Sequence, residues 1–186
     1  MIQPVIKHLI KPIRAIYFMV LALLMTLSSS VTAEDLSPAE LQDLFAGLAR
    51  GLTAAEAGNF ITALQEWKPL AEAGNSFALY NLGVMYESGQ GVIQDYKEAG
   101  KLYRLAAEQG YASAQGNLGI MYYYGHGVIQ DNTIAHMWFS VGAANGDEVG
   151  GSNIDKIAKK MTPAAIEKAQ AMARECMNSG YTKCGY

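Results

Sequence analysis

One stretch of the sequence occurs twice. Residues 81–94 read NLGVMYESGQGVIQ, and residues 117–130 read NLGIMYYYGHGVIQ, 36 residues later. A fainter copy at the same offset precedes them, in which Trp67 stands at the position of Tyr103. Repetition with a period of roughly 20–50 residues is typical of solenoids and other repeat architectures. The match continues beyond the quoted stretches at four pairs: Asp95/Asp131, Ala99/Ala135, Ala107/Ala143 and Gly110/Gly146.

Each repeat unit has the residue spacing of two amphipathic helices. In both helices the apolar residues recur three or four positions apart, which places their side chains on one helical face. A single helix pair cannot bury its apolar faces alone, so successive pairs are expected to stack into a solenoid. The residues concerned are Ala78, Leu82, Met85 and Tyr86 in the first helix and Ala99, Leu102, Tyr103, Ala106 and Ala107 in the second.

Turn and capping residues separate the helices within a unit. Gly89 and Gly91 interrupt the first helix, and Asp95 is placed to cap the second. Gly110 can end that helix, because glycine adopts the left-handed conformation with little strain. Gly83, on the apolar face of the first helix, would let the neighbouring helix approach closely.

The two ends of the chain carry further helix signals. Ser37 to Glu40 has the pattern of a capping box with proline at the first helical position. Thr162-Pro163 opens a last helix over about residues 163–177. Gly150-Gly151 is expected to delay the helix before it until near Ser152, because glycine is a poor helix former. Residues 34–186 are therefore predicted to form about eight helices in four pairs.

At these residues the chain resembles the Sel-one-like repeats, which are relatives of the tetratricopeptide repeat. The family pattern A-x-x-x-L-G-x-x-Y-x-x-G-x-G-V-x-x-D-x-x-x-A is matched at every named position from Ala78 to Ala99, and again from Ala114 to Ala135. The family ending A-A-x-x-G is present in the first copy, whereas Gly142 replaces the first alanine in the second. The resemblance covers residues 76–146 well and residues 40–75 loosely.

The resemblance implies an all-α fold, a right-handed α-solenoid of stacked antiparallel helix pairs. It implies that residues 34–186 form a single repeat domain with a concave face that binds another protein or peptide. It implies neither catalysis nor a cofactor. Within the domain it implies a degenerate repeat at 40–75, repeats at 76–111 and 112–146, and capping helices at 147–178.

The first 33 residues have the parts of a secretory signal. Lys7, Lys11 and Arg14 precede an apolar run over residues 16–27, and small residues then lead to Ala33. The run is about 12 residues long, against the roughly 20 that a helix needs to cross a bilayer. We therefore expect cleavage after Ala33 and a periplasmic or secreted protein; an uncleaved N-terminal anchor is the alternative.

Charge limits the possible partners of the mature chain. Residues 1–33 hold three cations and no acid, so their removal changes the net charge from −3 to −6. An acidic chain with dispersed Lys and Arg does not favour nucleic acid or an anionic membrane as a partner. We expect a monomer that meets a membrane only through the signal segment, before cleavage.

Both cysteines, Cys176 and Cys184, lie near the C-terminus. Export would place them in an oxidising compartment, where a pair of cysteines is more often bridged than free. We expect a disulfide that ties the tail to the last helix, with two free thiols as the alternative. No second pair of ligands accompanies them, so the pattern is not that of a zinc site.

The sequence contains no pattern that indicates an enzyme, a cofactor site or a metal site. The mature chain would hold two histidines: His126 in a loop and His136 on a helix, at the position of Gly100, where it is expected to face outward. Asp95 and Asp131 recur with the repeat and are explained as helix caps. The glycines likewise recur with the repeat and serve its turns.

Differences between the copies predict the binding residues, because packing constrains what recurs while ligand contacts are free to vary. Three consecutive tyrosines, residues 122–124, cannot all point into a core, and only the first occupies the core position. Tyrosine combines apolar area with a polar tip and is enriched at interfaces. Packing of the other two against the helices near residues 150–160 is the alternative. The predicted partner-binding residues are Tyr80, Tyr123, Tyr124 and His126.

Two classes of function follow from the sequence. The first is a non-catalytic, exported scaffold or adaptor that binds a protein or peptide. The second is a cell-wall-associated factor that binds peptidoglycan or regulates its enzymes. Retention on purified sacculi would distinguish the second class from the first.

Export gives the first testable prediction. N-terminal sequencing of the protein recovered from cells should begin at Glu34, because the signal peptidase cuts after small residues such as Ala33. A full-length species that stays in the membrane fraction would contradict this prediction.

Overall fold

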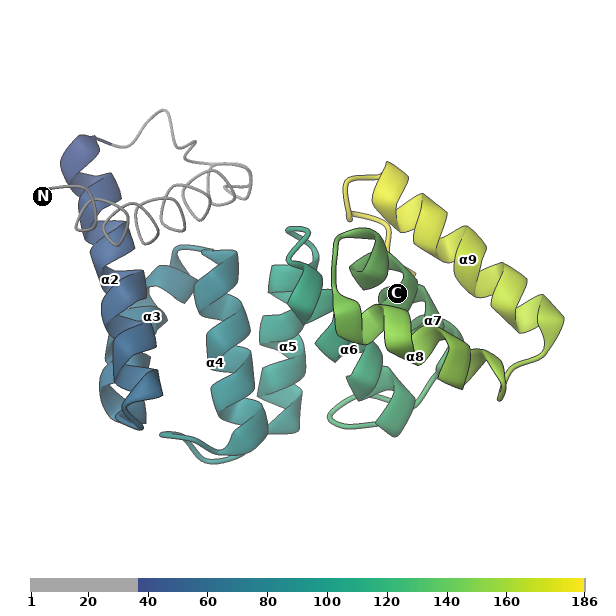
Figure 1. The fold of residues 1–186 in the computed structure, drawn as a ribbon, viewed down its shortest axis with the longest axis horizontal. Helices are drawn as coiled ribbons and strands as arrows, with labels where there is room; N and C mark the ends of the chain where they lie inside the picture. Colours follow the sequence, from purple (N-terminus) through teal and green to yellow (C-terminus); the bar gives the residue numbers. More distant parts are fainter. Residues whose placement is uncertain (1–36, 186) are drawn as a thin grey trace, which may run out of the picture.

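The computed structural model describes residues 37–185 as a series of α-helices joined by short connections, without a strand among those residues (Figure 1). The helices run in sequence from α2 at one end of the molecule to α9 at the other. Their number agrees with the eight expected from the sequence. The helices are α2 (Pro38–Glu56), α3 (Phe60–Glu72), α4 (Ser76–Ser88), α5 (Tyr96–Ala107), α6 (Ala112–Tyr124), α7 (Asn132–Ala144), α8 (Glu148–Ala158) and α9 (Pro163–Asn178).

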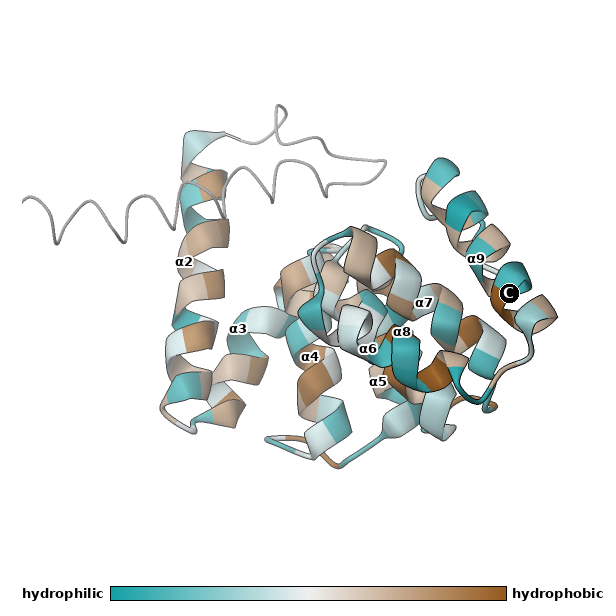
Figure 2. Cartoon of the chain, turned by 45° about the vertical axis from the view of Figure 1, so that its right-hand side comes forward, coloured by the Kyte–Doolittle hydropathy of each residue, from teal (hydrophilic) through white to brown (hydrophobic). Residues whose placement is uncertain are grey.

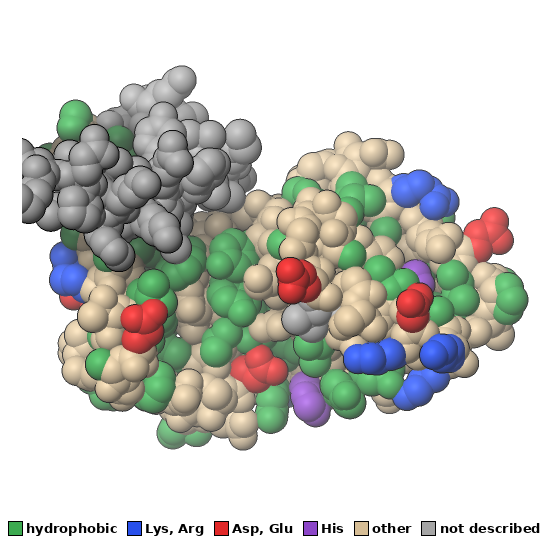
Figure 3. Space-filling model, in the orientation of Figure 1, with side chains coloured by type: hydrophobic (Ala, Val, Ile, Leu, Met, Phe, Trp, Pro, Cys, Tyr) green, Lys and Arg blue, Asp and Glu red, His purple; other side chains and the backbone are tan. Residues whose placement is uncertain are grey.

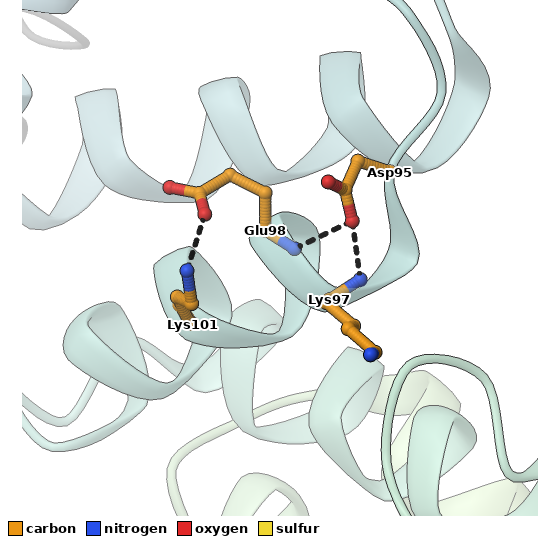
Figure 4. A network of polar contacts seen from close by, with 4 residues as sticks. All are labelled: Asp95, Lys97, Glu98 and Lys101. Atoms are coloured by element: carbon orange, nitrogen blue, oxygen red, sulfur yellow. Dashed lines mark hydrogen bonds and ion pairs between the residues drawn. The ribbon is translucent and has the colours of Figure 1, made fainter.

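The predicted capping residues begin the helices as expected. The Asp95 carboxylate accepts hydrogen bonds from the backbone N–H groups of Lys97 and Glu98, and the Glu98 carboxylate then pairs with Lys101 at 2.8 Å (Figure 4). Asp131 caps α7 in the same way. These bonds satisfy N–H groups that have no partner within the helix. Ser37 and Glu40 form the reciprocal capping box, and Thr162 caps α9.

The loop between the two helices of a repeat has the same construction in both copies. Gly89 and Gly91 adopt left-handed conformations, with φ of 71° and 73°. The Gln94 side chain donates to the Glu87 carbonyl at 2.8 Å, and Gln130 makes the equivalent bond to the Tyr123 carbonyl at 2.7 Å. Each loop is thus held closed by its own glutamine.

A glycine facing an aromatic ring brings the two helices together in each of the first three pairs. A Cβ atom added to Gly83 would lie 2.6 Å from the Tyr103 ring, which is closer than real Cβ contacts. Gly119 stands in the same relation to Phe139, also at 2.6 Å. In the degenerate first pair, Gly51 on α2 faces Trp67 on α3. The three rings are almost fully buried, so these contacts form the centre of the core.

Small residues separate the larger side chains of the core. The helices carry hydrophobic and hydrophilic residues in alternating bands, as expected when each has one buried stripe (Figure 2). Within the described range, no helix is both long enough and apolar enough to span a bilayer. The fully buried alanines that separate the larger side chains are Ala63, Ala78, Ala99, Ala106, Ala107, Ala114, Ala135 and Ala169.

The C-terminal capping region differs from expectation in one respect. Helix α8 begins at Glu148, not near Ser152, so the prediction of a late start was wrong. The Asp147 side chain accepts a hydrogen bond from the Gly150 backbone N–H, and this cap compensates for the poor helix propensity of the two glycines. Gly150 is also buried, close to the Phe139 carbonyl, where a side chain would not fit.

A disulfide returns the tail to the last helix. Cys176 and Cys184 are joined, with their Cα atoms 4.4 Å apart, and both are buried. The tail places the ring of Tyr181 against Gly110 at the end of the first repeat. The Tyr181 hydroxyl donates to the Asn145 side chain at 3.1 Å. The chain end therefore lies back against the repeats and not at the tip of α9 (Figure 1).

His136 does not face solvent, so the prediction made from its alignment with Gly100 was wrong. Its side chain is only 1% exposed, and its Nδ1 lies 3.3 Å from the Ser140 hydroxyl on the same helix. Gly100 is itself buried, and its equivalent therefore also lies in an interface. Burial lowers the pKa of His136 from its ordinary value, because the charged imidazolium is poorly solvated there.

The close glycine contacts lead to a stability prediction. Gly83→Val and Gly119→Val should each lower the free energy of unfolding by roughly 1–3 kcal/mol, because the added side chain overpacks the facing ring. Gln90→Val, in an exposed loop, is the control and should change it little. Thermal or urea unfolding measures the three variants, and equal shifts in all three would contradict the helix register.

The buried His136 leads to a prediction about pH. Its pKa is lower in the folded than in the unfolded chain, so the unfolded chain binds more protons as the pH falls through about 6.5. The contribution of neutral His136 to stability is therefore complete above that pH and is lost below it. As the pH is lowered from about 8 to about 5, the free energy of unfolding of His136→Gln should decrease less than that of the unaltered protein. A profile for His136→Gln that falls as steeply as that of the unaltered protein would refute the assignment.

Candidate partner-binding surface

The three consecutive tyrosines at the end of α6 have three different environments. Tyr122 is 6% exposed and accepts a hydrogen bond from the Arg104 guanidinium at 2.9 Å, so it belongs to the core. Tyr123 is half-buried, whereas Tyr124 is 61% exposed. The rotation of about 100° per residue along a helix accounts for this sequence of environments.

Aromatic side chains continue from Tyr123 across the neighbouring loop. The Tyr123 and Tyr124 rings meet edge to face with centroids 4.7 Å apart, and Tyr124 stacks on His126 at 5.5 Å. His126 in turn lies 4.9 Å from the ring of Tyr96, at the start of α5. We call these four side chains, Tyr96, His126, Tyr124 and Tyr123, the aromatic row.

A pocket of about 170 Å³ opens beside the aromatic row. Two of its walls are Tyr123 and Tyr124, and buried Phe139 and Ile157 supply apolar surface. Helix α8 contributes the polar side chains. The complete lining is Ile120, Tyr123, Tyr124, Phe139, Asn153, Lys156 and Ile157.

Tyr123 also contacts the segment that follows α8. The Lys160 ammonium lies 4.7 Å from the centre of the Tyr123 ring and donates a hydrogen bond to its hydroxyl. Tyr123 thus packs toward residues 150–160, as in the alternative interpretation of the sequence. Tyr124 has no such role, because most of its surface faces solvent.

The equivalent surface of the first repeat is different in chemistry. There Glu87 stands in place of Tyr123, and it accepts a hydrogen bond at 2.5 Å from the hydroxyl of Tyr103, which stands in place of Phe139. In the second repeat, tyrosine replaces this glutamate and phenylalanine replaces this tyrosine, so the carboxylate and the hydroxyl are both absent. The two replacing residues, Tyr123 and Phe139, line the pocket.

Tyr80 is not part of the aromatic row. Its ring packs 5.0 Å from Tyr111 and 5.8 Å from Tyr103, between the two repeats. In the next interface, the equivalent positions are Gly116 and Asp147, which also lie in contact. Burial raises the pKa of Tyr80 and raises that of Tyr111 to about 12. Among the described ring contacts, none joins Tyr80 to Tyr123 or Tyr124.

Sequence reasoning missed four residues of this surface: Tyr96, Asn153, Lys156 and Lys160. Each comes from a helix or turn that lies far from Tyr123 in sequence, and only the stacking of the pairs brings them together. The lysines carried a weak signal, since residues 156–160 contain three of them in an acidic chain. Within residues 37–185, no cluster of three or more potential metal ligands is present.

Comparison with known proteins agrees with this architecture. The family model of the Sel1 repeat matches residues 76–111 and 112–147. A search of curated proteins found no match. Among solved structures, a protective antigen present in uropathogenic Escherichia coli strains, described as displaying an SLR fold, has 29% sequence identity and a TM-score of 0.71.

That likeness covers 77% of this chain and 32% of the antigen, so the chain spans about a third of the antigen's length. A Sel1 repeat protein from Oxalobacter formigenes has 24% sequence identity and a TM-score of 0.58. The aligned region covers 78% of this chain and 69% of the Oxalobacter protein, and at this identity the likeness shows the fold alone. Sel1 repeats typically mediate protein–protein interaction. With two matched repeats in phase and the solenoid of helix pairs around them, the chain contains two Sel1 repeats.

Proposed function

We propose that the protein is a non-catalytic scaffold that binds a partner protein or peptide at the aromatic row and the adjoining pocket. The observation that carries the proposal is the 61% exposure of Tyr124 beside a pocket with apolar walls. Tyrosine and other aromatic residues around a pocket have the composition of binding hot spots. The antigen with the SLR fold and the Sel1 repeat protein have a similar helical fold.

The rigidity of the site supports this proposal. The Gln130 side chain and the left-handed glycines Gly125 and Gly127 hold the loop that presents His126. Lys160 holds Tyr123 from the other side. A surface that is already ordered loses little conformational entropy when a partner binds, and more of the contact energy then appears as affinity.

The proposal includes export to the periplasm or beyond, with the protein acting as a monomer. The signal segment at residues 1–33 supports it from the sequence, although it lies outside the described residues. The disulfide between Cys176 and Cys184 is of the kind that persists in oxidising compartments.

Site-specific photo-crosslinking tests the binding surface. With p-benzoylphenylalanine in place of Tyr124, irradiation of cells should give a discrete adduct of higher mass, because the side chain would lie within the interface. The same replacement at Ile61, which is 57% exposed on α3, is the matched control and should give none. Mass spectrometry of the adduct identifies the partner.

The identified partner then allows a quantitative measurement. Tyr124→Ala should weaken its binding on the order of thirtyfold, which corresponds to about 2 kcal/mol for a hot-spot side chain. The melting temperature should stay nearly unchanged, since Tyr124 is mostly exposed. Equal adducts at positions 124 and 61, or no adduct at 124, would refute the proposed surface.

A further inference from the structure

Two lysines stand at the pocket without an acidic partner. Lys156 lines the pocket, and its ammonium lies 3.3 Å from the side-chain oxygen of Asn153. Lys160 adjoins the pocket through Tyr123. Neither ammonium is paired with a carboxylate in the described part of the chain.

The positive charge here is local. The chain as a whole has a net charge of −3, yet Lys and Arg side chains gather over the C-terminal end of α8, next to hydrophobic side chains (Figure 3). Lysines at the end of a helix also complement its dipole. Complementing the helix dipole does not require a lysine to lie at a pocket. Lys156 nevertheless lines the pocket, and the Lys160 ammonium lies over the ring of Tyr123, which forms one of the pocket walls.

The first repeat has an acidic residue at the position that corresponds to Tyr123. The equivalent of Tyr123 there is Glu87, whose carboxylate is bonded to Tyr103. An acid at position 123 would lie beside the Lys160 ammonium and would pair with it. Its replacement by tyrosine leaves both ammonium groups available to a ligand and makes the surface apolar at the same time.

We propose that the partner contributes an acidic peptide segment, with an apolar side chain that enters the pocket and a neighbouring carboxylate that pairs with Lys156 and Lys160. This inference rests on the proposed function and adds the chemistry of the partner. The apolar walls from Phe139 and Ile157 select the inserted side chain. The lysines select the charge beside it, and the acidic remainder of the scaffold disfavours the same peptide elsewhere.

Selection from a randomised decapeptide display library tests the inference on the purified protein. The enriched peptides should carry Asp or Glu within one or two positions of Leu, Ile, Phe or Met. Selection on Lys156→Glu should lose the acidic preference, because the charge at the pocket is reversed. Lys168→Glu, an exposed change of the same kind on α9, is the matched control and should keep the preference.

Affinity measurements with an enriched peptide complete the test. By fluorescence anisotropy, Lys156→Gln and Lys160→Gln should each raise Kd on the order of tenfold, and Lys168→Gln should not. Binding should weaken as salt is raised, since ion pairs near solvent are screened. The same peptide with its acids changed to lysine should bind Lys156→Glu better than it binds the unaltered protein.

The outcomes separate the two proposals. Enriched peptides that are apolar without acids, and that lose affinity for Tyr124→Ala, would overturn the acidic-peptide inference and leave the proposed function intact. Peptides that bind Tyr124→Ala as tightly as the unaltered protein would overturn both. A third outcome is that no peptide is enriched, while the protein binds phosphatidylserine vesicles and Lys156→Glu abolishes that binding. This result would also overturn both proposals and would indicate that the surface binds a membrane.

Discussion

The contact between a glycine on one helix and an aromatic ring on the next determines the geometry of this solenoid. At Gly83 and Gly119 the facing ring occupies the space that a side chain would need. The two helices of a pair can therefore approach closely, and the ring fills the interface without a void. Since each pair then stacks on the next, the position of every later helix depends on this contact.

The same contact forms part of the candidate site. Phe139, which packs on Gly119, also lines the pocket beside Tyr123 and Tyr124. Its equivalent in the first repeat, Tyr103, has a hydroxyl that donates a hydrogen bond to Glu87. The two copies thus differ here by one hydroxyl and one carboxylate. The first copy has a polar contact between its own side chains, whereas the second has a pocket lined by the corresponding residues. Repeat proteins can specialise one unit in this way because each unit contacts only its neighbours.

The disulfide-linked tail has a structural role distinct from this surface. It carries Tyr181 back to Gly110 and Asn145, and the Asn145 amide in turn donates to buried Gln115. These polar contacts connect the end of the chain with the junction between the two repeats. The end of α9 is thereby attached to the repeats by polar contacts, in addition to the packing of α9 on α7, which gives the solenoid a closed end.

The repeat itself determined most of the fold. The spacing of apolar residues, the aspartate caps and the glycine turns are local signals. They predicted the number of helices and the capping residues of α2, α5 and α9, because helix formation and capping depend on neighbours in sequence. Only the tertiary structure decided which of the variable residues face a common surface. It showed that α8 begins earlier than its glycines suggested, that His136 is buried, and that Tyr80 packs between the repeats. It also brought Lys156, Lys160 and Tyr96 to the tyrosines of α6, because contacts between stacked helices depend on packing angle and approach, which no local pattern encodes.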